Sequence, residues 1–325
     1  MDQLFIFSRR RKESRTVAML QKINRVVNWT ALVNIVKVID KSNTGKGGRK
    51  PLPFEWKVKM LFLQYAFNLS DPELEDMLTD RLSFQKFVGI PFDQEIPDFT
   101  TLWYFKEALL EHRLMDKLFS SINHQLTLHG LILKKGTLAD ATIIESSGTP
   151  LSEKKREELE REPSKQIDTQ AQSTEKNGKM YFGYKGHIGV DAQSKLIRKR
   201  KFTPANVHDS QVFEELSSGD EKSLWGDKAY ANDKLKRAAR FMGLYYGILD
   251  RARRGHPLSG KQHQRNKQKS SVRASVEHPF AFMRNKLKMT LASAKTMTRN
   301  ALRFDMFCIV YNVLRGAHLL QLKAA

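Results

Sequence analysis

The chain has 325 residues, of which 40% are hydrophobic and 10% aromatic, so it is long and apolar enough to fold around a substantial core. Its 56 Lys and Arg residues outnumber 35 Asp and Glu residues, and the resulting formal charge of +21 favours a polyanionic partner, nucleic acid above all. No apolar run approaches the roughly 20 residues that span a bilayer, and the basic runs lack an amphipathic helix, so a membrane partner is not expected.

The N-terminus and the cysteine content favour a cytoplasmic protein. An apolar stretch precedes the basic run at residues 9–12, which reverses the order found in a secretory signal. A single cysteine, Cys308, lies in an apolar segment and can form no internal disulfide. We therefore expect Cys308 to be a small residue of the core.

The chain up to residue 130 has the apolar spacing of amphipathic helices. Leu20, Ile23 and Val27, for example, recur three and four residues apart. Alternating patterns typical of strands are absent from this part. The pattern predicts an all-α domain over residues 1–130.

From residue 131 onward, short β-like runs alternate with helical segments. The strands are expected over residues 136–144, 180–190, 196–202 and 244–249, and the helices over residues 208–217, 233–242, 270–289 and 301–320. Residues 146–179 are polar and read as a surface insertion between the first two strands. The pattern predicts an α+β domain over residues 131–325, with a mixed sheet flanked by helices and a C-terminal helix.

Three acids are candidate metal ligands. Asp140 lies within the first apolar strand, where an ionised carboxylate is costly unless it is paired, exposed at an edge or bound to a metal. Asp227 follows a short apolar run and so falls at the carboxyl end of a strand, where ligand sites gather. Glu277 lies in a predicted helix, with Arg273 one turn earlier on the same face.

Taken singly, each acid also has an ordinary structural explanation, such as an edge-exposed aspartate or a surface ion pair. Together, three carboxylates suit hard cations such as Mg²⁺. Two such ions can activate a water or 3′-hydroxyl nucleophile and stabilise the leaving oxygen of a phosphodiester. The combination predicts metal-dependent chemistry on nucleic acid.

Basic residues near these acids are candidate contacts to DNA phosphates. Residues 251–273 hold eight Lys or Arg residues and no acid, and their glycines and proline predict an irregular loop that binds phosphate. Lys185 and His187 could approach phosphate too, although a solvated sheet face explains them equally well. The candidates from these patterns are Lys228, Arg251, Arg253, Arg254, Lys261, Arg265, Lys267, Lys269 and Arg273.

Three segments carry more distinctive residue patterns. The first contains FEWKVKMLFLQYAFNLSDPELEDMLTDRLSFQKFVGI, followed by PDFTTLWYFKEAL. The second pairs LADATIIES around Asp140 with WGDKAY around Asp227, and the third is RASVEHPFAFMR around Glu277. Together they resemble the DDE transposases of bacterial insertion sequences, the insertion-sequence-five family in particular, over most of the chain.

The resemblance implies an RNase H-like catalytic domain, with Asp140, Asp227 and Glu277 as its catalytic acids. Related families often have Tyr, Arg, Glu and Lys at fixed steps, and here Arg273 and Glu277 fit while Ser270 stands in place of the Tyr. Arg284 stands in place of the Lys and keeps a positive charge for phosphate. A proline two residues after Glu277 predicts a bend in its helix.

The resemblance also implies the function. We expect a DNA transposase that cleaves strands at insertion-sequence ends and transfers them into target DNA, with two Mg²⁺ ions per active site and Mn²⁺ as a substitute. Its partners are double-stranded DNA, both terminal inverted repeats and target, and further copies of itself in a homodimer or higher oligomer. Residues 1–130 would bind the repeats and assist assembly, in the bacterial cytoplasm at the nucleoid. The alternative is a DNA-binding protein or nuclease that no longer transposes.

Overall fold

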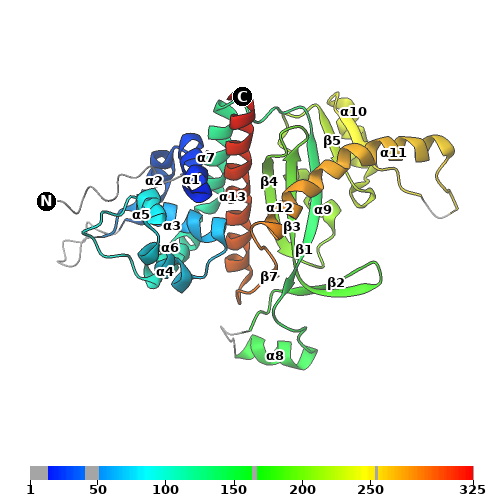
Figure 1. Ribbon diagram of the computed structural model, residues 1–325. Helices are drawn as coiled ribbons and strands as arrows, with labels where there is room; N and C mark the ends of the chain where they lie inside the picture. The colour runs from blue at the N-terminus through cyan, green and yellow to red at the C-terminus, as the bar shows by residue number, and fades with distance from the viewer. Residues whose placement is uncertain (1–13, 41–50, 163–166, 253–254, 325) are drawn as a thin grey trace.

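The computed structural model describes residues 14–40, 51–162, 167–252 and 255–324, and its first part is a cluster of helices (Figure 1). These are α1 (Arg15–Val26), α2 (Trp29–Val36), α3 (Phe54–Phe67), α4 (Asp71–Asp80), α5 (Leu82–Val88), α6 (Phe99–Glu111) and α7 (Met115–Leu128), with the 3₁₀ turn η2 (Lys37–Ile39). No strand occurs in the described part of the chain before residue 137. We call residues 54–128 the helical layer.

Local chemistry explains where these helices begin and end. At the start of α4, the Ser70 hydroxyl accepts from the Glu73 N–H and the Glu73 carboxylate accepts from the Ser70 N–H. This reciprocal cap satisfies two N–H groups that the first turn would otherwise leave unpaired. The preceding helix, α3, ends at Asn68, which adopts the left-handed conformation with φ 51°.

The second part is built around a sheet. Its strands are β1 (Thr137–Ser146), β2 (Gln172–Lys176), β3 (Lys179–Asp191), β4 (Ile197–Pro204), β5 (Ser223–Gly226), β6 (Tyr245–Ile248) and β7 (Leu291–Ala292). β1, β3 and β4 are antiparallel neighbours, and β5 and β6 lie parallel to β1 on its other side. β1 therefore lies at the centre of the order β4-β3-β1-β5-β6.

Helices cover both faces of this sheet. Leu138 of β1 belongs to the large core that includes the C-terminal helix α13 (Met297–Ala324), whereas its neighbour Ala139 belongs to a smaller core with α9 (Asp209–Leu216). Successive residues of a strand point to opposite faces, so the two helices lie on opposite sides. α10 (Asp233–Phe241) packs next to β6.

Helix α13 stands between the helical layer and the sheet (Figure 1). Its buried Asn312 accepts a hydrogen bond from the Ile197 N–H of β4 at 2.8 Å and donates to the Ile197 carbonyl at 2.7 Å. The same amide donates to Asn123 of α7 at 2.8 Å. One buried side chain thus ties the sheet to the helical layer. Cys308, on the same helix, is fully buried, which confirms its prediction as a core residue.

Residues 146–179 contain the short helix α8 (Glu153–Arg161) and strand β2. β2 pairs with the first half of β3, and the resulting hairpin extends away from the sheet (Figure 1). Within the described ranges, no helix combines the length and apolarity needed to cross a bilayer.

One prediction about residues 251–273 is wrong. The expected irregular loop contains the helix α11 (Gly260–Arg273), which Ser259 and Gln262 begin with a reciprocal cap. The helix expected over residues 270–289, with a bend at Pro279, is divided by the 3₁₀ turn η4 (Ala274–Val276) before α12 (Glu277–Asn285). Pro279 has no N–H to offer the carbonyl four residues earlier, which explains the break just upstream of it.

Candidate active site

The pairing of β1 with β5 sets Asp140 beside Asp227. The two strands run parallel, with Leu138 opposite Trp225. Both aspartates lie two residues beyond that pair, and side chains two residues apart share one face of a strand. The register therefore directs both carboxylates to the same side of the sheet.

Asp227 also begins the next element. Its carboxylate accepts a hydrogen bond from the Lys228 N–H at 2.6 Å and caps the 3₁₀ turn η3 (Lys228–Tyr230). The Asp227 side chain is 34% exposed and that of Asp140 is 17% exposed. The two carboxylates are thus partly enclosed yet open to a ligand.

Arg273 lies between the two aspartates. Its Nη2 atom is 3.4 Å from Asp140 Oδ1 and 3.9 Å from Asp227 Oδ2. Its Nε atom is buried and has no hydrogen-bond partner in the described structure. One positively charged group therefore balances both carboxylates while part of its own donor capacity is unused.

The electrostatics of Asp140 reflect these surroundings. Burial raises the pKa of its carboxyl above the ordinary value of 3.8, and the charge of Arg273 offsets part of that rise. Lys176 of β2 acts in the same direction as Arg273. A second cation placed beside Asp140 would favour the ionised form further.

Glu277 does not join the two aspartates in this conformation. It is exposed at the first residue of α12, and its carboxylate makes no hydrogen bond or ion pair with any described residue. Among the residues that the structure describes, no three His, Cys, Asp or Glu side chains gather as a metal-binding group. This conformation therefore does not bring the three acids together, and Arg273 lies beside the two aspartates.

The remaining pair still fits a divalent ion. Asp140 and Asp227 supply hard oxygen donors, which Mg²⁺ and Mn²⁺ prefer. Both oxygens lie within 4 Å of a single cationic atom, so the space between them already accommodates positive charge. An ion entering there would have to displace Arg273.

The predicted DNA contacts fall into two groups. Lys269 is buried and donates to the Ile248 carbonyl at 2.7 Å, and it pairs with Asp250 at 3.5 Å. Arg265 lies 3.8 Å from the same Asp250. Lys269 is thus used inside the fold, and its prediction as a phosphate contact is wrong.

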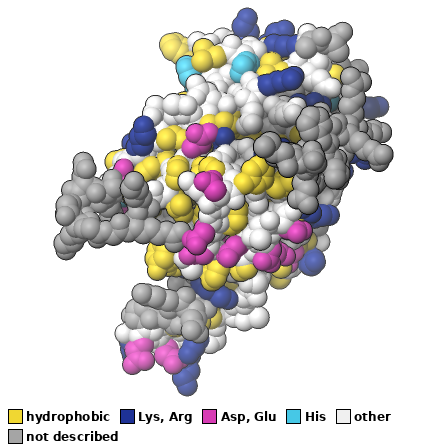
Figure 2. Space-filling model, turned by 60° about the vertical axis from the view of Figure 1, so that its left-hand side comes forward, with side chains coloured by type: hydrophobic (Ala, Val, Ile, Leu, Met, Phe, Trp, Pro, Cys, Tyr) yellow, Lys and Arg dark blue, Asp and Glu magenta, His cyan; other side chains and the backbone are white. Residues whose placement is uncertain are grey.

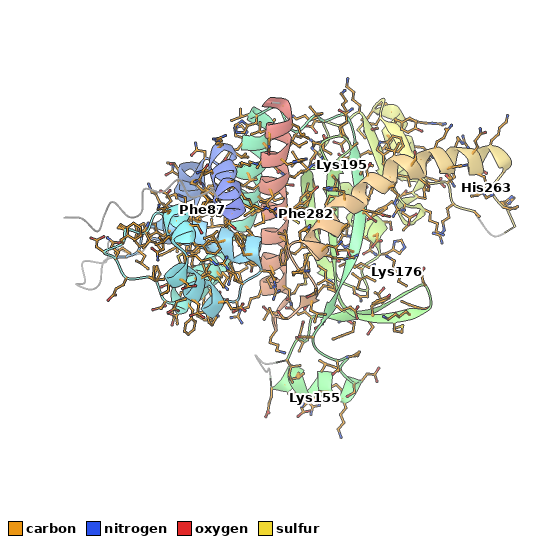
Figure 3. The ribbon with its side chains drawn as sticks, in the orientation of Figure 1. Phe87, Lys155, Lys176, Lys195, His263 and Phe282 are labelled. Carbon is orange, nitrogen blue, oxygen red and sulfur yellow. The ribbon has the colours of Figure 1, made fainter. Side chains whose placement is uncertain are left out.

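Other candidates remain free to meet DNA. Lys228, Arg251, Lys261 and Lys267 are exposed and have no acidic partner among the described residues. Helix α11, which carries two of them, projects past the sheet, as the label on His263 marks in Figure 3. Arg253 and Arg254 lie outside the described residues.

Arg284 lies at a separate hollow next to β1. It donates to the Thr142 hydroxyl and, with Lys176 and Tyr181, lines a hollow of about 520 Å³. Figure 3 labels Lys176 on the β2 hairpin. Lys176 and Arg284 thus border the strand that carries Asp140, and Glu145 lines the same hollow.

Lys185 and His187 neither reach outward to DNA nor form a solvated sheet face, so neither interpretation of these two residues is met. Lys185 pairs with Asp209 at 3.0 Å and donates to the Val207 carbonyl. His187 is fully buried, and its Nε2 bonds Thr203 at 2.9 Å. Burial lowers the pKa of His187 from 6.5 to about 4.

One residue of the site escaped the sequence patterns. Tyr230 ends the turn that Asp227 begins, and it is almost completely buried. Its hydroxyl has no hydrogen-bond partner in the described structure. Its only signal in the sequence was its position three residues after Asp227. That position alone does not distinguish a tyrosine of the active site from an ordinary tyrosine of the core.

Comparison with known proteins decides the family. The family model described as "Transposase DDE domain" matches residues 133–313, which is more than half of the chain. The chain belongs to the transposase DDE domain family. A second model, "Transposase domain (DUF772)", matches residues 7–108 of this transposase.

The transposase is also similar to a solved structure, piggyBac transposase in a synaptic complex with hairpin DNA. The TM-score is 0.47 and the identity 11%, over 95% of this chain and 75% of that one.

Family membership confirms three of the expectations from the sequence. The fold is α+β, with an RNase H-like domain preceded by a helical region. The protein is a DDE-type DNA transposase, and DNA is its partner. Enzymes of this family generally use divalent metal ions.

Proposed function

We propose that the transposase belongs to the insertion-sequence-five family of bacterial mobile elements, cleaves DNA at the element ends and joins those ends to target DNA. The main support for the proposed catalytic site is the position of Arg273 Nη2, within 4 Å of carboxylate oxygens of both Asp140 and Asp227. Two carboxylates that share one cation form a site that a divalent ion fits.

The proposed cofactors are two Mg²⁺ ions per active site, with Mn²⁺ as a substitute, held by Asp140, Asp227 and Glu277. When bound, such ions activate the attacking oxygen and stabilise the leaving oxygen of the phosphodiester. Asp140 and Asp227 are held in place by the parallel pairing of their strands. Arg273, once displaced, has a guanidinium fork that suits a phosphate.

Glu277 is the proposed third carboxylate, and it requires a movement. It lies directly after the 3₁₀ turn that separates α11 from α12. Such a break within a helix is a common place for a functional hinge. Rotation there would carry Arg273 away from the aspartates and Glu277 toward them, because both side chains flank the same turn.

DNA is proposed to lie along the exposed cations of the catalytic domain and to be bound as well by the basic segment of residues 1–53. Residues 1–53 hold twelve Lys or Arg residues against three acids. We therefore assign recognition of the terminal repeats within the proposed domain 1–130 to its first part, and assembly to its helical layer. The proposed domain 131–325 acts on the repeats and on target DNA. Joining two element ends calls for a homodimer or higher oligomer, acting at the bacterial nucleoid.

The test is cleavage of a plasmid that carries candidate element ends, with Mg²⁺ as the only divalent ion. We expect Asp140→Asn, Asp227→Asn and Glu277→Gln each to lower the cleavage rate on the order of 10³-fold or more, while salt-sensitive DNA binding is retained. The exposed Asp93→Asn, in the helical layer, is the matched control and should cleave like the wild type.

Each result bears on a separate assignment. Wild-type cleavage by any one of the three variants removes that acid from the mechanism. Cleavage without joining of ends to target DNA would contradict the proposed transposition reaction and indicate a nuclease.

A further inference from the structure

Helix α11 leads outward from the site formed by Asp140 and Asp227. Its last residue is Arg273, whose Nη2 atom lies 3.4 Å from Asp140 Oδ1. Its first turn projects past the sheet, where His263 is labelled in Figure 3. The helix has 14 residues, which at about 1.5 Å per residue give a length of about 21 Å. One helix therefore joins the proposed active site to the solvent beyond the sheet.

Polar contacts hold one face of α11 against the catalytic domain. Lys269 Nζ donates to the Ile248 carbonyl at 2.7 Å. The Asn266 amide accepts from the Asp250 N–H at 2.8 Å and donates to the Asp250 carbonyl at 3.0 Å. Asn266, Lys269 and Arg273 are three and four residues apart, so they share one side of the helix. These contacts fix which way the helix faces.

The opposite face of α11 points into solvent and consists of hydrogen-bonding side chains. Its residues recur at steps of one, three and four along the helix and are all exposed, namely His263, Gln264, Lys267, Gln268 and Ser271. The only large apolar residue of the helix is Val272. This face therefore lacks the apolar and aromatic anchors typical of a protein interface, and it suits a polar partner.

The charge of α11 identifies that partner as a polyanion. The helix has five Lys or Arg residues and no acid. Lys261, Arg265 and Lys269 recur four residues apart, and like charges at that spacing destabilise a helix. Arg265 and Lys269 share one acid, Asp250, at 3.8 and 3.5 Å. The phosphates of DNA would supply the further negative charge that this helix favours.

The dimensions of α11 fit the major groove of duplex DNA. An α-helix with its side chains is about 10–12 Å across, and the groove is about 12 Å wide. A glutamine can form two hydrogen bonds with the edge of an adenine in that groove. Gln264 and Gln268 lie one turn apart on the exposed face.

We propose that α11 lies in the major groove beside the bond that is cut, where Gln264 and Gln268 hydrogen-bond to base edges. This inference rests on the proposed active site, and it adds sequence recognition to the catalytic domain. Gln264 and Gln268 are specificity-determining residues in this arrangement, and Lys261 contacts phosphate.

The length of the helix predicts which base pairs are read. Gln268 and Gln264 lie five and nine residues before Arg273, which corresponds to about 8 and 14 Å along the helix axis. Successive base pairs are about 3.4 Å apart. With the cut bond at Asp140 and Asp227, the two glutamines read positions roughly two to four base pairs away from it.

The test is a selection from duplexes that carry a candidate element end, with about eight base pairs randomised on each side of the expected cut. The full chain is incubated with these duplexes and Mg²⁺, and the bound and the cleaved duplexes are sequenced separately. Gln264→Ala and Gln268→Ala should each lower the discrimination between bases about tenfold at one position, two to four base pairs from the cut. Alanine favours a helix more than glutamine does, so α11 persists in both variants.

Two control variants separate base contacts from other effects. Gln94→Ala removes an exposed glutamine of the helical layer and should keep the wild-type preference at every position. Lys261→Gln removes an exposed cation of α11 itself. It should weaken binding to all sequences alike and leave the base preference unchanged.

Asp140→Asn separates this inference from the active site on which it rests. This variant should bind with the wild-type base preference and fail to cleave. Cleavage by Asp140→Asn would contradict the proposed active site, while the sequences of the bound duplexes would still decide the role of α11. A wild-type preference in both glutamine variants, or an equal loss of affinity for every sequence, would overturn base reading by α11 and leave the active site untouched.

Discussion

The helical layer and residues 228–303 differ sharply in charge. The helical layer has seven Lys or Arg residues and twelve acids, whereas residues 228–303 have nineteen Lys or Arg residues and three acids. On the face of the molecule shown in Figure 2, acidic side chains form a band among hydrophobic ones. A surface of that kind repels a phosphate backbone. From this difference we infer that residues 228–303 are better suited than the helical layer to contact a DNA backbone.

The largest expected effect separates these two regions by DNA binding. Replacing Lys228, Lys261 and Lys267 with Gln removes three exposed cations, so the slope of log K against log salt should become shallower by about 2 to 3. The matched control replaces Lys86, Arg113 and Lys117 of the helical layer, which are also exposed, and should leave the slope unchanged. Equal effects of the two triple variants on fluorescence-anisotropy titrations would contradict the assignment of the DNA surface.

A smaller effect separates the regions by their response to acid. His187 of the catalytic domain is fully buried and its pKa lies at about 4, against 6.5 for an ordinary histidine. The unfolded chain therefore takes up this proton more readily than the folded one. The contribution of neutral His187 to the free energy of unfolding is fully present above pH 6.5. It decreases by about 3 kcal/mol as the pH falls toward 4.

His187→Gln should remove most of that decrease in the free energy of unfolding, measured by urea denaturation at pH 7 and at pH 4.5. His124→Gln, an exposed histidine of the helical layer, is the control and should keep the full decrease. The same acid response in both variants would show that His187 is not its source.

Patterns in the sequence predicted the parts of the molecule that depend on near neighbours. The alternation of apolar residues around Asp140 and the short run before Asp227 predicted two strand-borne carboxylates, and parallel pairing brings these together. The cap that Ser70 and Glu73 form at the start of α4 is another feature that depends only on near neighbours.

Features that depend on distant contacts or on weak periodicity were not predictable. Helix α11 has almost no apolar residues, so no apolar period marked it, and its signal was the cap formed by Ser259 and Gln262. The exposed position of Glu277 depends on the 3₁₀ turn before it. The unpaired hydroxyl of Tyr230 depends on contacts with α9 and with β5 that no spacing encodes.

The most direct test of the catalytic assignment is anomalous X-ray diffraction from crystals of the transposase grown with Mn²⁺. The account predicts an anomalous peak between the carboxylates of Asp140 and Asp227, with Arg273 moved away from them. A structure in which Arg273 stays between the two aspartates, with Mn²⁺ bound elsewhere or not at all, would contradict it.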